Sequence, residues 1–88
     1  MNGLYNIKDL QGTWGDLMNH PNDNQAIRAF EWVMKTNAFM GANKHDFEFW
    51  KVGEYNQDTG EFTMYPKADW EILRKGEDIN TNERDTII

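Results

Sequence analysis

The sequence predicts an α+β fold, in which a small antiparallel sheet carries one amphipathic helix packed on one face. One segment has apolar side chains at helical spacing, and the segments on both sides of it alternate or are rich in aromatic residues. The connections between these segments are short, which favours antiparallel pairing of the strands. The predicted order along the chain is strand, strand, helix, strand, strand.

The helix is predicted from residue 22 to about residue 36. Asn22 precedes Gln25 at the spacing of a capping box. Five apolar residues then share one face at a period of 3.6, namely Ala26, Ile27, Phe30, Val33 and Met34. Asn37 is interpreted as a left-handed residue that ends the helix, and residues 38–45 as a loop.

Strands are predicted on both sides of the helix. Residues 4–10 alternate as the first strand, residues 11–13 form a turn, and residues 14–18 form a weaker second strand. Residues 47–55 form the third strand, in which Phe47 and Phe49 lie on the face opposite to Trp50 and Val52. This switch indicates either burial on both faces or a bulge near Gly53.

Beyond residue 55, a hairpin turn over residues 56–60 places Gly60 at its left-handed position. Residues 61–65 form the return strand, with Phe62 and Met64 expected to face the core. Residues 67–75 are compatible with one short helix or with an edge strand through Trp70 and Ile72. We expect a single domain over residues 1–76 and a disordered tail over residues 77–88.

Composition limits the classes of function. The chain has 88 residues, with 15 acidic against 9 basic residues and a net charge of -6, unlike a non-specific duplex DNA binder. Leu, Ile, Val and Phe make up only 17 residues, so the other aromatic residues must help to build the core. A chain this small gains from association, and we expect a homodimer. We expect no signal peptide and no membrane-spanning segment.

The sequence does not indicate catalysis. It contains no Ser and no Cys, which excludes serine and cysteine nucleophiles and thiolate zinc sites. His20 and His45 have acidic neighbours, but their spacing matches no metal-ligand motif. We therefore expect a protein that is not an enzyme and that has no metal and no cofactor.

The aromatic residues Trp14, Trp50, Tyr55 and Trp70 cannot all be assigned to the core from their spacing. They complete a small core or a dimer interface, or they stack single-stranded bases. In the second case the basic partners are Lys8, Lys44, Lys51 and Lys67.

Three sequence blocks resemble a known family when they are taken together. They are residues 4–9, the segment Ala26-Ile27-Arg28-Ala29-Phe30 within residues 22–30, and residues 44–62 with Asp46-Phe47-Glu48, Gly53-Glu54 and Thr59-Gly60-Glu61. In this order they resemble the small nonstructural protein of gokushovirus-type microviruses, which are single-stranded DNA phages. The resemblance implies a role in genome replication and packaging, as a counterpart of the protein that switches synthesis to single-stranded DNA. It also implies the host bacterial cytoplasm and, for some members, DNA binding.

Two hypotheses follow from the residues and the resemblance. In the first, a local basic and aromatic cluster contacts single-stranded DNA while the acids face away; its residues are Lys8, Arg28, Lys44, Lys51, Trp50 and Tyr55. In the second, the protein engages a phage replication protein, a capsid precursor or a host factor without touching nucleic acid. Lysines beside exposed aromatic side chains favour the first hypothesis, and acids beside them favour the second.

Overall fold

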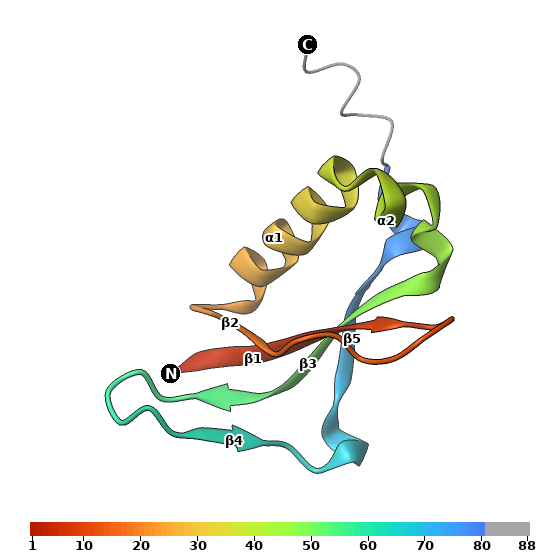
Figure 1. The fold of residues 1–88 in the computed structure, drawn as a ribbon. Helices are drawn as coiled ribbons and strands as arrows, with labels where there is room; N and C mark the ends of the chain where they lie inside the picture. The colour runs from red at the N-terminus through yellow and green to blue at the C-terminus, as the bar shows by residue number, and fades with distance from the viewer. Residues whose placement is uncertain (81–88) are drawn as a thin grey trace.

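The computed structural model describes residues 1–80, which form a five-stranded antiparallel sheet with one long helix on one face (Figure 1). The elements are β1 (Asn2–Asp9), β2 (Met18–His20), α1 (Asp23–Thr36), α2 (Ala38–Ala42), β3 (Phe47–Tyr55), β4 (Phe62–Met64) and β5 (Glu71–Lys75). Short 3-10 turns span Lys44–Asp46, Lys67–Asp69 and Gly76–Asp78. The predicted α+β fold is confirmed.

β3 is the central strand of the sheet. One edge of β3 pairs with β1, which in turn pairs with β2. The other edge is shared, because β5 pairs with residues 48–51 and β4 pairs with residues 53–55. β4 and β5 therefore meet at a corner of the sheet, where the turn Lys67–Asp69 joins them (Figure 1).

A bulge interrupts β3 where the sequence predicts one. Leu4 lies opposite Gly53 and Tyr5 lies opposite Lys51, so Val52 is an extra residue in β3. The following hairpin also agrees with the prediction, since Gly60 has a positive φ of 78°. Both predictions rest on local chemistry.

α1 begins as predicted, because the side chain of Asn22 accepts a hydrogen bond from the backbone N–H of Gln25 at 2.9 Å. Its buried face carries Phe30, which stacks on Phe49 of β3 at a centroid distance of 4.9 Å. Tyr5 of β1 also stacks on Phe49, at 5.4 Å. These three aromatic rings join the helix to the sheet and form the centre of the core.

The predicted end of the helix is wrong in its detail. Asn37 has an extended backbone with φ of -89°, and its side chain accepts from the N–H of Met40 at 3.1 Å. Asn37 therefore caps a second helix, α2, where the sequence analysis expected a loop over residues 38–45. The prediction failed because Asn serves equally well as a helix start and as a helix stop.

The predicted strand over residues 14–18 is also wrong. Trp14 makes only an isolated bridge with Lys8, and β2 begins at Met18. The backbone N–H of Gly15 donates to the carbonyl of Ile7 at 2.9 Å, and no regular ladder forms before Met18. Gly15 has no side chain to pack in a strand, which favours an irregular backbone over this segment.

At the β4–β5 corner, the alternative of an edge strand is confirmed and the alternative of a helix over residues 67–75 is wrong. β3 offers an unpaired edge to residues 71–75, and this long-range pairing overrides the local helical spacing. The prediction that Phe62 and Met64 face the core is wrong, because both side chains are exposed, that of Phe62 by 59%.

The ordered chain continues past the predicted domain boundary at residue 76. The turn Gly76–Asp78 places Ile79 in the core, where it is 2% exposed. The ammonium of Lys44 donates to the carbonyl of Ile79 at 3.2 Å. The prediction of a disordered tail is therefore wrong for residues 77–80, and the rest of that tail, residues 81–88, lies outside the described residues.

Candidate functional site

The sheet has two faces with different surroundings. One face packs against α1, and the side chains of Tyr5 and Ile7 point to it. The opposite face is called the far face here. Its strand residues follow from alternation in β1 and from the pairing register: Asn2, Leu4, Asn6, Lys8, Glu48, Trp50, Tyr55, Phe62, Met64, Ile72 and Lys75.

Three tryptophans from separate segments meet on the far face. The ring of Trp14 lies edge-on to Trp50 at 5.5 Å and edge-on to Trp70 at 5.2 Å. Trp50 donates from Nε1 to Glu48 at 3.2 Å, and Trp70 donates from Nε1 to the carbonyl of Tyr65 at 2.8 Å. All three indoles are half-buried. We call Trp14, Trp50 and Trp70 the tryptophan cluster.

Two lysines lie over this cluster. The Nζ of Lys8 is 5.4 Å from the ring centroid of Trp14, and the Nζ of Lys67 is 5.2 Å from Trp14 and 4.4 Å from Trp70. These are cation–π distances. Neither lysine forms an ion pair with any residue between 1 and 80. Both positive charges can therefore contact an anionic ligand.

The acids on the strands are distributed unevenly between the two faces. On the far face, Glu48 lies between Lys8 and Lys75 in one row of the sheet. By the same register, Asp9, Glu54 and Glu71 lie on the face toward α1. The overall charge of -6 is thus not the charge of the far face, whose strands carry two lysines and one glutamate.

The structure brings together only part of the predicted site. Lys8, Trp50 and Tyr55 all lie on the far face. Lys51 points to the other face and pairs with Asp23 at 3.0 Å, while Arg28 lies on the exposed side of α1. Lys44 lies in the turn Lys44–Asp46, where its ammonium donates to the carbonyl of Ile79 at 3.2 Å. Tyr55 lies opposite Asn2 at the far end of the β1–β3 ladder, so the structure brings together only Lys8 and Trp50 of the six residues.

Three residues outside the predicted set, Trp14, Trp70 and Lys67, lie together with Lys8 and Trp50 on the far face. The sequence analysis named each of them as an aromatic or basic candidate. It could not place them, because Trp14 and Lys67 lie outside the regular strands and Trp70 directly precedes β5. A signal for Lys51 was present, since its strand parity is that of the core residue Phe49.

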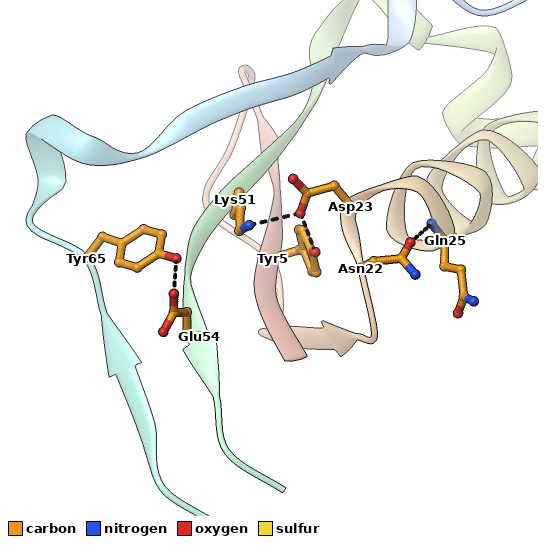
Figure 2. A network of polar contacts seen from close by, with 7 residues as sticks. All are labelled: Tyr5, Asn22, Asp23, Gln25, Lys51, Glu54 and Tyr65. Atoms are coloured by element: carbon orange, nitrogen blue, oxygen red, sulfur yellow. Dashed lines mark hydrogen bonds and ion pairs between the residues drawn. The ribbon is translucent and has the colours of Figure 1, made fainter. Parts of the chain in front are cut away.

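The face toward α1 holds a polar network at the start of the helix (Figure 2). Asp23 accepts from the hydroxyl of Tyr5 at 2.7 Å and from Lys51 at 3.0 Å. Nearby, the hydroxyl of Tyr65 donates to Glu54 at 2.9 Å. Tyr5, Asp23, Lys51 and Glu54 border an open cleft of about 490 Å³ between β1, β3 and the first turn of α1.

The network shifts three pKa values. Burial raises the pKa of Tyr5, and its hydrogen bond to Asp23 and the charge of that carboxylate raise it further. Burial by itself would raise the pKa of Asp23, but the bonds from Tyr5 and Lys51 together lower it below its usual value. Burial and the contact with Glu54 raise the pKa of Tyr65 to about 12. Near neutral pH the hydroxyls of Tyr5 and Tyr65 therefore stay protonated. The bonds from Tyr5 and Lys51 to Asp23 join the first turn of α1 to β1 and β3, and we call this three-residue arrangement the clamp.

This clamp predicts a pH dependence of stability. Because folding lowers the pKa of Asp23, its contribution is complete above the pKa of the unfolded chain and is lost as the pH falls through the folded pKa. Asp23→Asn should remove this contribution. Urea unfolding at neutral and at acidic pH should show a smaller acid destabilisation for Asp23→Asn than for wild type. An equal acid destabilisation would contradict the clamp, and Asp58→Asn on the exposed hairpin is the matched control.

The two histidines have different surroundings. His20 packs its ring against Tyr5 at 5.7 Å, and Nδ1 of His45 lies 3.5 Å from Glu77. Within residues 1–80, no three His, Asp or Glu side chains are grouped so that they could hold a metal ion. Over the same residues, no helix has the length and apolar character needed to cross a bilayer.

The fold and the far face define a small α+β protein whose sheet presents aromatic and lysine side chains on the side away from its helix. The model of one protein family, described as "Phage ORF5 protein", matches residues 2–79. The chain therefore belongs to the phage ORF5 protein family and is encoded by a phage. A search of curated proteins and a search of solved structures found no match.

Proposed function

We propose that this chain is a non-enzymatic phage accessory protein that acts in the synthesis and packaging of a single-stranded DNA genome, in the cytoplasm of the bacterial host. It binds single-stranded DNA weakly through the far face. The observation that carries this proposal is the tryptophan cluster with Lys8 and Lys67 above it. Membership of a phage family supports the setting.

The chemistry of the far face suits a single strand better than a duplex. Unpaired bases expose their π-faces and stack on aromatic side chains with about 1–3 kcal/mol per base. In a duplex these faces are stacked inside, and the phosphates of a duplex would meet a protein with a net charge of -6. Among the described residues, the basic side chains that can contact phosphates on this face are Lys8, Lys67 and Lys75, so affinity is low. The slope of log K against log salt should be about -2, from roughly -0.7 per phosphate contact.

Fluorescence anisotropy of a labelled short oligothymidine tests the proposal. Wild type should bind saturably at low salt, and Trp70→Ala should lose about tenfold in affinity because a stacking surface and a lysine platform are removed together. Phe39→Ala, which removes an exposed aromatic ring on α2, is the matched control and should bind as wild type does. Absence of saturable binding at low salt, or an equal loss in both variants, would contradict the proposal.

Glu48 provides a second test with the opposite sign. Its carboxylate lies between Lys8 and Lys75 and accepts from Trp50. Glu48→Gln keeps an oxygen acceptor for the indole but removes a negative charge from the far face. Affinity for the oligothymidine should rise about two- to threefold at low salt, the size of a partly screened charge contact. Asp58→Asn, which removes a charge from the distant hairpin, should leave the affinity close to wild type; weaker binding by Glu48→Gln would contradict the charge argument.

One observation favours a second candidate function. Phe62, Met64 and Ile72 are exposed apolar side chains on the same far face, and such a patch suits a protein partner. That partner would be a phage replication protein, a capsid precursor or a host factor. A titration without DNA binding, together with loss of partner binding in Phe62→Ala, would support this alternative.

A further inference from the structure

α1 carries an exposed aromatic residue on the side away from the sheet. Trp32 is 61% exposed. Arg28 lies four residues before it and Lys35 three residues after it, so all three share one surface of the helix. Arg28 forms no ion pair with a described residue. In a chain with a net charge of -6, this is a local basic and aromatic knob.

The β4–β5 corner carries a hollow with the complementary chemistry. It has a volume of about 540 Å³ and is lined by Tyr65, Ala68, Asp69, Trp70 and Glu71. Its aromatic walls are fixed, because Tyr65 donates to Glu54 and Trp70 donates to the carbonyl of Tyr65. Asp69 and Glu71 contribute two carboxylates to this lining, and the ammonium of Lys67 lies 4.4 Å from the ring centroid of Trp70. The hollow therefore offers an aromatic lining and negative charge to a cationic, aromatic group.

The knob and the hollow cannot meet within one chain. α1, which carries the knob, lies above the sheet in this view, whereas the turn that joins β4 to β5 lies at the bottom (Figure 1). The residues that line the hollow belong to this turn and its neighbours. We propose that Trp32 of one copy enters the hollow of a second copy, with Arg28 and Lys35 placed against Asp69 and Glu71. Opposite charge and an aromatic fit argue for this occupant.

The contact gives weak self-association. One indole and a few charges bury far less than the roughly 1,200–2,000 Å² of a standard interface. If the contact is reciprocal, the pair closes as a two-fold dimer; if it is not, it extends head to tail. The charges are exposed, so association should weaken as salt rises. The contact uses Trp70, which also belongs to the tryptophan cluster, so it is tested without DNA.

Sedimentation velocity without DNA tests the proposal over micromolar to millimolar protein. Wild type should associate with rising concentration, and Arg28→Glu and Asp69→Lys should each weaken the association at least tenfold. The double variant, which exchanges the two charges, should recover most of it. Asp58→Lys makes the same charge change on the exposed hairpin and should associate at least as well as wild type.

An NMR readout identifies the residue that is covered. As wild type is concentrated, the indole resonance of Trp32 should shift, and Arg28→Glu should abolish this shift. Three results would overturn the proposal: a monomer at every concentration, failure of the double variant to recover, or a loss in Asp58→Lys equal to that in Asp69→Lys. All substituted positions are exposed, and circular dichroism confirms that the variants are folded.

Discussion

Phe49→Ala should lower the free energy of unfolding by about 3–5 kcal/mol, the largest effect of any single truncation in this chain. Phe49 is 1% exposed and is stacked between Phe30 of α1 and Tyr5 of β1. Among the described residues, its removal leaves a cavity where rings from α1, β1 and β3 meet. A domain of this size has a total stability of about 0.05–0.15 kcal/mol per residue, or about 4–13 kcal/mol for 88 residues, so the variant should lose a large share of its stability.

Urea denaturation followed by circular dichroism measures this effect. Phe39→Ala is the matched control, because Phe39 is 67% exposed and touches the core only at the edge of Phe47. The control should change stability by less than about 1 kcal/mol. A Phe49→Ala variant that unfolds within the same margin of wild type would show that the three-ring stack is not the centre of the core.

Gly76→Ala should be strongly destabilising, although it adds only a single methyl group. A Cβ at this position would lie 2.3 Å from the carbonyl oxygen of Lys44 and 3.1 Å from that of Phe47. Both obstacles are backbone atoms, so no side chain can turn aside to relieve the clash. The turn Gly76–Asp78 would have to move and would withdraw Ile79 from the core, so we expect a loss of about 1–3 kcal/mol or more.

The same denaturation experiment tests this prediction. Gly12→Ala is the control, because a Cβ there would lie 3.4 Å from its nearest neighbour, a side-chain oxygen of Asp9. Equal stabilities of the two variants would contradict the packing of residues 76–79 against the turn Lys44–Asp46. A clear loss only in Gly76→Ala would establish that the domain extends beyond the boundary predicted at residue 76.

The parts of the fold that sequence analysis predicted are those that local chemistry determines. The cap at Asn22, the spacing of the α1 core residues, the bulge at Val52 and the turn at Gly60 are each set by a few neighbouring residues. β5 depended on a distant partner, the free edge of β3, and the local pattern over residues 67–75 could not decide between helix and strand. The burial of Ile79 likewise depends on a long-range contact, with Lys44.

The candidate site followed the same division. Strict alternation along β3 places Trp50 on the face opposite to Phe49 and assigns Lys51 to the face of Phe49. It would assign Tyr55 to that face as well, but Tyr55 reaches the far face because Val52 is an extra residue in the strand. Periodicity makes no prediction outside regular strands, and Trp14 and Lys67 lie in irregular segments. Only the three-dimensional structure could place these two residues on the far face.

The four tryptophans provide the most direct test of single-stranded DNA binding by the far face. Their indole N–H resonances should be followed by NMR while a short oligothymidine is added at fixed, low protein concentration. Trp14, Trp50 and Trp70 lie on the far face and Trp32 lies on the opposite side of the molecule, so it serves as an internal control. We expect the first three resonances to shift together and that of Trp32 to stay in place. No shift, or a shift of Trp32 alone, would contradict the account.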